Sequence, residues 1–372
     1  MFYVLLVVFI FEHNLVFLYL MKVLNIFSKI KRWEEWPFQL LYAPISIFWI
    51  WYTIKSGSCW FFTPSNPKLT FGGMEGEPKK EMYDLLPTHL YPVTFYVSPH
   101  ENLISIKTKL AVHQIKYPFI VKPAIGEQGI LLRKIEDESA LKSYHDLMPW
   151  DYIVQDLVYH PMELSVFYIR NPNEKRGMIT GFLHKISLHV IGNGKDDLAS
   201  LIVQHPKGNK RIPELFKKHG AKWDHVLESG EIYMLSYAAN HNRGAQFIDL
   251  KQHIDDKLLA VFDDISLSVN DFFYGRYDIM CTNIPDLKLG KNFTILEFNG
   301  CGAEPNHFYD NGYTLINAYR EILKHWKALY QISKYNSMHV VKPWPFIKGL
   351  IFFRATTAHK KNMKKVDANI GG

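Results

Sequence analysis

The spacing of hydrophobic and polar residues changes repeatedly along this chain and predicts a mixture of strands and helices. Short apolar runs that alternate with polar residues predict strands, and apolar residues three and four positions apart predict helices. The predicted strands are Phe119–Lys122, Ile130–Ile135, Tyr152–Gln155, Glu163–Arg170, Met178–Leu183, Tyr274–Met280 and Phe293–Phe298, and the predicted helices are Ser139–Met148, Lys257–Phe273 and Gly312–Gln331. Such a mixture predicts an α/β or α+β fold.

Two longer apolar stretches lie near the start of the chain, and we expect them to be helical. The first covers residues 1–20 and is broken by Glu12-His13-Asn14. It has neither the basic region nor the small-residue cleavage site of a secretory signal, and Met21 is an alternative start of the protein. The second, Phe38–Ile54, has 17 residues, which is near the lower limit for a transmembrane helix.

The composition of the second stretch and of the C-terminal tail indicates contact with a membrane. Trp49, Trp51 and Tyr52 are residues that favour the bilayer interface. The tail combines Trp344 and Phe346 with a lysine-rich end, and such a combination binds anionic membrane surfaces. An interfacial helix is favoured over a spanning one, because spanning would place the basic residues 22–32 opposite a cytoplasmic body. The alternative is that the second stretch packs on the body and the tail is solvated.

The net charge of +7 is concentrated at the two ends of the chain. Residues 340–372 hold seven lysines and arginines against Asp367 alone, residues 21–55 have a net charge of +3, and residues 56–339 have a net charge of −1. A near-neutral body argues against a nucleic acid as partner, and basic ends favour the inner face of the cell membrane. With 48% hydrophobic residues the chain is not disordered. Its three cysteines lack CxxC spacing, which predicts neither disulfides nor zinc and fits the cytoplasm.

The first candidate for chemistry is a lysine followed by a glycine-containing turn, Lys122-Pro-Ala-Ile-Gly126-Glu-Gln-Gly129. Two glycines allow backbone N–H groups to approach phosphates, and a lysine on the preceding strand adds a positive charge. No Gly-Lys-Ser/Thr follows, so the segment is not a Walker loop. By itself it could equally be a simple turn.

The second candidate is Gln155-Asp156-Leu157-Val158, with Glu163 beyond it. Backbone groups at the end of a strand can bind the edge of an adenine, and a carboxylate a few residues later can accept the ribose hydroxyls. The alternative interpretation is a strand end followed by a surface glutamate.

The third candidate is the strongest and consists of Arg276-x-Asp278 on one predicted strand and Glu297-x-Asn299 on another. Side chains two positions apart on a strand point to the same face. Two adjacent strands would therefore present an arginine, two carboxylates and an amide together. Mg²⁺ prefers such oxygen ligands, together with phosphate oxygens and water. A salt-bridged surface patch is the alternative.

These features in this order resemble the ATP-grasp superfamily, and in particular its D-alanine–D-alanine ligase-like members, over roughly residues 105–310. The resemblance implies an α+β fold in which two lobes grip ATP, preceded by the hydrophobic helical N-terminal segment. The parts implied are a membrane-associated segment at 1–58, an N-terminal lobe at 59–110, an ATP-grasp domain at 111–335 and a basic aromatic tail at 336–372. Residues 188–202 look more like the cyanophycin-synthetase branch.

The resemblance also implies roles for individual residues. ATP would be bound by Lys122, Gly126, Gly129, Gln155, Asp156, Val158, Glu163 and Lys185. Mg²⁺ or Mn²⁺ would be bound by Asp278, Glu297 and Asn299. Lys185 would contact phosphate, and Arg276 would stabilise the acyl-transfer intermediate. Arg170 and Arg243 are candidates for holding a substrate carboxylate, and Lys107 or Lys109 for touching the nucleotide.

The sequence departs from the dipeptide ligases at two of these segments. The glycine turn lacks their serines, and Gly-Cys-Gly replaces Thr-Pro-Gly after Asn299. The implied activity is therefore an ATP-dependent carboxylate–amine or carboxylate–thiol ligase with small-molecule substrates that the sequence does not name. The alternatives are a phosphotransferase that acts on a hydroxyl group and a non-catalytic nucleotide-binding protein.

Overall fold

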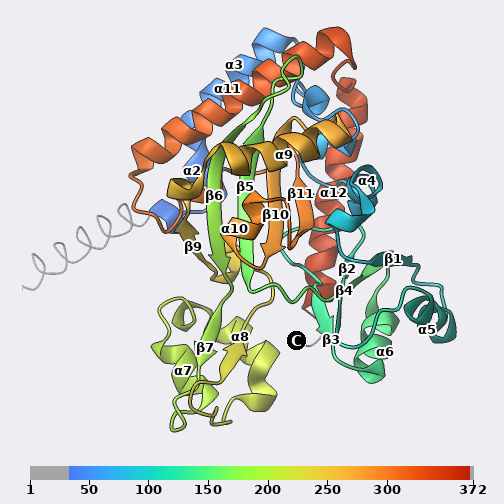
Figure 1. Cartoon of the computed structure of the whole chain (residues 1–372), viewed down its shortest axis with the longest axis vertical. Coiled ribbons are helices and arrows are strands. Elements are labelled where there is room, and N and C mark those ends of the chain that lie inside the picture. Colours follow the sequence, from blue (N-terminus) through green and yellow to red (C-terminus); the bar gives the residue numbers. More distant parts are fainter. Residues whose placement is uncertain (1–32, 369–372) are drawn as a thin grey trace, which may run out of the picture.

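A computed structural model describes residues 33–368 of the protein. The apolar run at 1–20, the basic residues 22–32 and the alternative start at Met21 lie outside the described residues. The described strands form three sheets, in each of which neighbouring strands are antiparallel, and helices cover these sheets (Figure 1). The class is α+β, as predicted.

The central sheet has five strands in the order β11-β10-β5-β6-β9. Their bounds are β5 (Met162–Ile169), β6 (Met178–Ile186), β9 (Gln246–Asp249), β10 (Tyr274–Cys281) and β11 (Phe293–Asn299). Helix α9 (Asp256–Val269) lies across one face of this sheet, with α10 (Ile284–Lys288) beside it (Figure 1). The four longest of these strands were predicted within a few residues.

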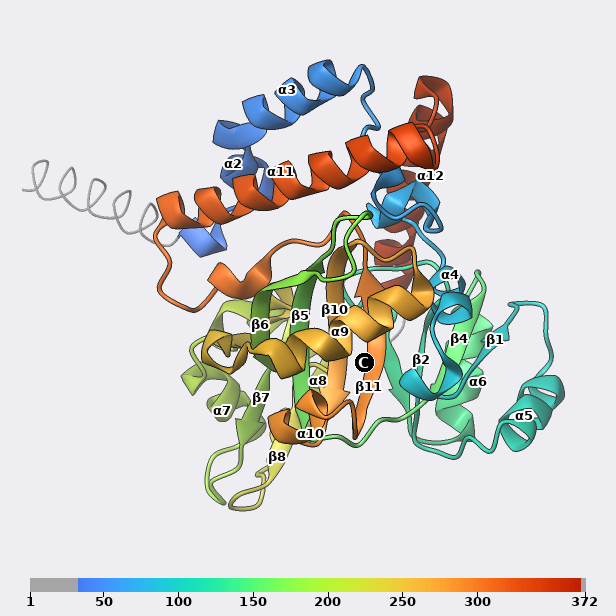
Figure 2. The same ribbon diagram turned by 45° about the horizontal axis from the view of Figure 1, so that its top comes forward.

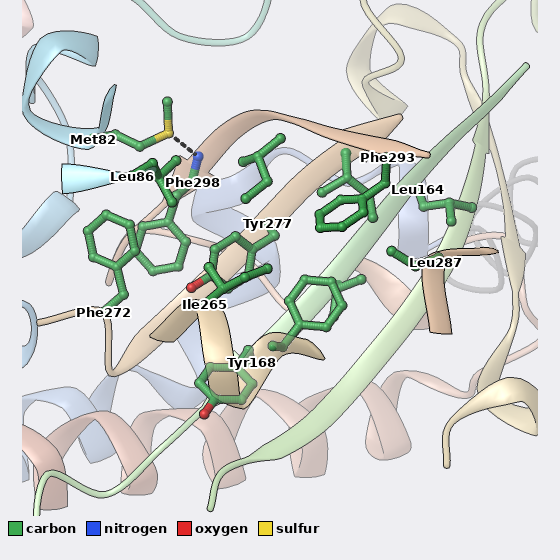
Figure 3. Packing of buried hydrophobic residues seen from close by; sticks show 14 of the residues in the cluster. Met82, Leu86, Leu164, Tyr168, Ile265, Phe272, Tyr277, Leu287, Phe293 and Phe298 are labelled. Carbon is green, nitrogen blue, oxygen red and sulfur yellow. Dashed lines mark hydrogen bonds between the residues drawn. The ribbon is translucent and has the colours of Figure 1, made fainter. Parts of the chain in front are cut away.

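The core between α9 and the central sheet determines which side chains of β10 and β11 lie on the opposite face of that sheet. Tyr277, Phe298 and Phe272 pack together there, and the rings of Phe272 and Phe298 stack with centroids 4.1 Å apart (Figure 3). A register shift at Asp278/Ile279 makes a bulge in β11, so that Ile295 and Phe298 are both buried in this core. Buried aromatic residues on one face therefore hold the polar residues of β10 and β11 on the opposite face.

The second sheet has four strands in the order β1-β4-β2-β3. Their bounds are β1 (Thr94–Val97), β2 (Phe119–Pro123), β3 (Arg133–Ile135) and β4 (Tyr152–Asp156), and helices α5 (Leu103–Val112) and α6 (Glu138–Leu147) accompany them. Strand β3 is shorter than predicted, because residues 130–132 form a turn in which Leu131 has a positive φ of 60°. The hairpin between β2 and β3 was correctly predicted.

A small third unit lies between β6 and β9 in the sequence. It contains β7 (His189–Ile191), α7 (Leu198–Gln204), α8 (Ile212–His219) and β8 (Ile232–Met234). Strand β7 pairs with β8, and the unit has its own cluster of buried apolar residues. In Figure 1 it lies below the central sheet, opposite the four-stranded sheet.

The apolar stretch 38–54 is interrupted in the structure. Helix α2 (Phe38–Tyr42) is followed by a 3-10 turn at Ala43–Ile45, and α3 (Ser46–Ser56) comes after it. Figure 2 shows α3 alongside the long helix α11 (Leu315–His339). Within residues 33–368, no helix has the length and apolar character that crossing a membrane requires.

The C-terminal segment is helical and packs on the body. Helix α11 continues eight residues beyond the predicted helix, because Ser333 and Asn336 are buried and donate to the carbonyls of Phe62 and Pro64. Helix α12 (Phe346–Asp367) follows, and its residue Met363 is buried in the core of the four-stranded sheet. The described tail is therefore ordered structure.

The remaining elements are short. Helix α4 (Lys79–Leu85) precedes the four-stranded sheet. The 3-10 helices are Trp33–Glu35, Ala43–Ile45, Thr63–Ser65, Thr70–Gly73, Thr88–Leu90, Asn209–Arg211, Gly220–Lys222, His241–Arg243, Lys251–His253 and Asn306–Phe308.

Candidate active site

The polar residues of β10 and β11 meet as the sequence predicted. These strands are neighbours, and their register pairs Arg276 with Asn299 and Asp278 with Glu297. Because residues paired across antiparallel strands point to the same face, all four side chains gather on the face opposite α9.

Asp278 is the centre of this cluster. The Arg276 guanidinium donates to both of its carboxylate oxygens over 3.1 Å, and the Asn299 amide donates to Oδ2 over 3.1 Å. Burial would raise the pKa of Asp278, but the positive charges of Arg276 and Lys185 outweigh it and lower that pKa to about 2. Asp278 is therefore a carboxylate at any physiological pH.

Lys185 and Glu163 extend the cluster onto β5 and β6. These two residues are paired in register, and the Lys185 ammonium lies 2.7 Å from Glu163 Oε1 and 3.3 Å from Asp278 Oδ1. Burial raises the pKa of Glu163, against the opposing effect of Lys185. The structure thus joins Glu163, Lys185 and Asp278 into one network, although they come from three different strands.

Lys79 completes the cluster and was missed in the sequence. Its ammonium, at the start of α4, lies 2.7 Å from Glu297 Oε1 and donates to the carbonyl of Gly126 over 3.1 Å. It therefore connects the central sheet to the glycine turn. No local pattern in the sequence indicates this role, because the two charged partners are 218 residues apart.

Tyr83 connects the two larger sheets beside the cluster. Its hydroxyl accepts from Lys122 Nζ over 3.3 Å and from Gln155 Nε2 over 2.9 Å, and donates to the carbonyl of Leu296 over 2.8 Å. Lys122 and Gln155 are both buried side chains of the four-stranded sheet. Two of the predicted ATP-binding residues are thus brought next to β11.

If Lys122 binds a phosphate of MgATP as the sequence predicts, the pKa of Lys122 sets how that binding depends on pH. Burial, with the nearby positive charge of Lys79, lowers this pKa from 10.5 to about 8. Between pH 8 and pH 10.5 the folded protein therefore holds fewer protons than the unfolded chain, and the free energy of unfolding should increase with pH over this range. An anionic phosphate favours the charged lysine, so MgATP should bind about tenfold more weakly at pH 9 than at pH 7. Calorimetric titration at both pH values measures this change.

A Lys122→Met variant should bind MgATP more weakly and with a flat pH profile. Lys142→Met is the matched control, because Lys142 pairs with Asp146 on the exposed side of α6 and should leave the profile unchanged. Equal affinity of the unmodified protein at pH 7 and pH 9 would contradict the role of Lys122.

The glycine turn is held from two sides. Gly129 has a φ of +68°, and a Cβ there would lie 2.5 Å from the Cβ of Ala238. On the other side α12 contacts the turn: His359 Nε2 lies 3.3 Å from the carbonyl of Ile125, and Asp367 accepts from the backbone N–H of Leu131 over 3.0 Å. Glycine at position 129 thus permits both the backbone conformation and the close approach.

Asp156 and Val158 lie at and just beyond the end of β4. Asp156 is exposed and Val158 is half-buried. Lys107 and Lys109, on α5, are ion-paired with Glu138 and Glu101 respectively. The structure thus places the predicted adenine-binding segment at a strand end and gives both lysines of α5 acidic partners beside the four-stranded sheet.

The two candidate substrate arginines are not brought into the cluster. Arg170 is buried against α9, where its guanidinium donates to Ser266 Oγ and to the carbonyl of Glu174. Arg243 lies 3.2 Å from Glu214 and 3.7 Å from Asp367, and it lines a cavity of about 400 Å³ between α8, the glycine turn and the end of α12. The guanidinium of Arg170 is thus held by hydrogen bonds within the protein, whereas that of Arg243 lines the cavity.

A second group with ligand-type side chains lies elsewhere, at Glu34, His241 and Asp310. Asp310 accepts from Lys207 Nζ over 2.7 Å and from the backbone N–H of Phe247 over 3.0 Å. These two donors hold the Asp310 carboxylate, and the Asp310 backbone N–H donates to Glu34 Oε2 over 3.0 Å. We therefore assign this group to the packing of Glu34 and its neighbours on the body.

No protein-family model matches the sequence, and no curated protein matches it. Among solved structures, similarity is found to a bifunctional glutathione synthetase from Pasteurella multocida (13% identity, TM-score 0.34) and to the VanG D-Ala:D-Ser ligase from Enterococcus faecalis (12% identity, TM-score 0.38). A D-alanine–D-alanine ligase from Bacillus anthracis gives 12% identity and a TM-score of 0.39.

The structural similarity is to one synthetase and two ligases. The matches cover 66%, 70% and 74% of this chain, respectively. They cover 36% of the glutathione synthetase, 62% of the D-Ala:D-Ser ligase and 71% of the D-alanine–D-alanine ligase.

Proposed function

We propose that the protein is an ATP-dependent ligase of the ATP-grasp type, which joins a small-molecule carboxylate to an amine or a thiol. The supporting observation is the cross-strand cluster of Asp278, Glu297 and Asn299 with Arg276 and Lys185. The carboxylates of such a cluster can bind a metal ion, and its buried cations can bind the phosphate groups that the metal ion contacts.

The donor set fits Mg²⁺ or Mn²⁺. Asp278 and Glu297 supply carboxylate oxygens and Asn299 an amide oxygen, and hard divalent ions prefer such ligands. The low pKa of Asp278 and the lowered pKa of Glu297, where burial is outweighed by Lys79 and Lys122, keep both carboxylates charged. A metal bound there would offset phosphate charge.

The lysines around the cluster would bind phosphate groups. Lys79 and Lys185 form ion pairs with Glu297 and Asp278, respectively. The ammonium group of Lys122 has only the Tyr83 hydroxyl as its hydrogen-bond partner among the described residues. Lys122 and Lys185, together with the backbone of the glycine turn, would position the triphosphate. Gln155, Asp156 and Val158 would border the adenine, and Glu163 would accept from the ribose hydroxyls.

The reaction would then proceed in two displacements. A substrate carboxylate oxygen attacks the γ-phosphorus, and the bond from that phosphorus to the ADP oxygen breaks, giving an acyl phosphate and ADP. The amine or thiol attacks the acyl carbon, the bond from that carbon to the phosphate oxygen breaks, and the nucleophile's proton is released. Arg276 would stabilise the negative oxygen of the tetrahedral intermediate.

Hydroxylamine trapping tests this proposal. Incubation of the protein with MgATP, hydroxylamine and a panel of carboxylic acids should yield a hydroxamate with at least one acid, together with one ADP for each hydroxamate. Hydroxylamine captures the activated acyl group because it is a strong nucleophile, and colorimetric detection of the iron–hydroxamate complex measures the product.

The products also separate the alternatives. A stable phosphoester without hydroxamate would show a phosphotransferase instead. Tight binding of ATP with no turnover on any substrate would favour a non-catalytic nucleotide-binding protein. Omission of the acid is the control, because ADP release should then be small.

A further inference from the structure

Helix α3 has two apolar faces, and the described part of the chain covers one of them. Trp49 packs against Trp326 with ring centroids 5.1 Å apart, and Tyr52 stacks on Tyr330 at 4.7 Å, so this face is fixed to α11. The exposed residues of the other face are Ile47 (66% exposed), Ile50 (55%), Trp51 (56%) and Ile54 (68%). Their spacing of three and four residues places them on one side of the helix.

The beginning of α12 presents a second set of exposed apolar side chains. They are Phe346, Ile347, Ile351 and Phe353. Trp60 connects this set to the end of α3, because it follows Ile54 by six residues and its indole N–H donates to the carbonyl of Phe346 over 3.0 Å. The eight exposed residues of α3 and α12 are called the apolar surface below.

The charged residues of the two segments that carry the apolar surface have one sign. The sequence has no aspartate or glutamate between Glu35 and Glu75, nor between Glu321 and Asp367. The cations Lys55, Lys348 and Arg354 are exposed within these two segments. The carboxylate nearest to α12 that an interaction places there is that of Glu75, which accepts from Thr356 Oγ1 over 3.3 Å. Apolar side chains on segments whose own charged residues are cations complement an anionic surface.

We propose that the apolar surface docks the protein onto an anionic lipid bilayer. Tryptophan and phenylalanine beside lysine are suited to the level of the lipid headgroups, where apolar rings insert and ammonium groups meet phosphates. A second copy of the chain is disfavoured as the occupant, since a symmetric contact would bring the same cations together. Docking is superficial, because no described helix can span the bilayer.

Vesicle co-sedimentation of the full chain tests this proposal. Vesicles of phosphatidylcholine with phosphatidylglycerol should bind the protein at least tenfold more strongly than phosphatidylcholine alone, and high salt should weaken this binding. The double variants Ile47→Ser/Trp51→Ser and Ile347→Ser/Ile351→Ser should each lower the partition coefficient at least tenfold. The matched control is Ile104→Ser/Val112→Ser, which removes equally exposed residues (77% and 71%) from α5.

Each result has a defined meaning. Partitioning of both double variants equal to that of the control would overturn the proposal and assign any membrane contact to another part of the chain. Equal binding to neutral and anionic vesicles would also overturn it. A change from dimer to monomer in the variants, measured by light scattering, together with unchanged vesicle binding, would identify a second copy as the partner. ADP release without vesicles should be unchanged in the variants, so a failure of the ligase proposal is seen separately.

Discussion

Replacement of Asp278 by asparagine should lower MgATP turnover about a thousandfold. The substitution keeps the size of the side chain but removes the charge that Arg276 and Lys185 face at 3.1 and 3.3 Å. Removing one partner of a buried ion pair costs about 3–5 kcal/mol. If the cost falls on the bound transition state, about 4 kcal/mol corresponds to about a thousandfold in rate. ADP release under saturating MgATP measures the effect.

A surface aspartate provides the control for this prediction. Asp84 pairs with Lys80 on the exposed side of α4, and Asp84→Asn should change turnover less than twofold. The melting temperature of the Asp278 variant should be recorded alongside, so that a loss of folded protein is not scored as a loss of chemistry. Full turnover by a folded Asp278→Asn variant would contradict the metal-binding role.

Replacement of Gly302 by alanine should lower the free energy of unfolding by about 3 kcal/mol, the upper end for overpacking. A Cβ at this position would lie 2.0 Å from the carbonyl oxygen of Met74, and the nearby backbone is fixed by a hydrogen bond of 2.9 Å from Gly302 N–H to the Gly73 carbonyl. Residues 72–74 and 300–302 cross in close contact here, and Asn299 of the cluster lies one residue before the second segment. Turnover should therefore fall as well. Urea denaturation measures the stability change.

Gly220 is the matched control for this substitution. A Cβ at Gly220 would meet only the ring of Phe216, at 3.9 Å, and the backbone there has a helical φ of −55°. Gly220→Ala should therefore change the free energy of unfolding by less than about 0.5 kcal/mol. Equal free energies of unfolding of the Gly302→Ala and Gly220→Ala variants would show that residues 72–74 and 300–302 can move apart at little cost.

The sequence predicted those parts of the site that local periodicity encodes. Arg276 with Asp278, and Glu297 with Asn299, are two positions apart on strands, and the period of a strand alone puts each pair on one face. Lys122 was recognised because a strand and a glycine turn frame it. The bulge in β11 was not predicted, since a register shift depends on the partner strand rather than on the sequence of the strand that bulges.

The sequence could not reveal the contacts that bring distant segments together. Lys79 and Tyr83 lie on a short helix before the four-stranded sheet, and nothing local distinguishes them from surface residues. Their roles arise because α4 lies between the two sheets, where Lys79 reaches Glu297 and Tyr83 reaches Gln155. Arg170 shows the converse: the sequence offered it as a substrate ligand, and the tertiary structure satisfies its guanidinium at α9.

By itself, the sequence determined the fold class, most strand positions and all charged groups of the cluster except Lys79, because these follow from side-chain periodicity and residue chemistry. Only the tertiary structure decided how the ends of the chain are used. The aromatic stretch at 38–54 has apolar residues on all sides, and periodicity cannot say which of them pack on α11 and which remain exposed. The same holds for α12, where Phe352 packs inward and Ile351 is 65% exposed. Burial is a property of the neighbours that a residue meets, and those neighbours come from distant parts of the chain.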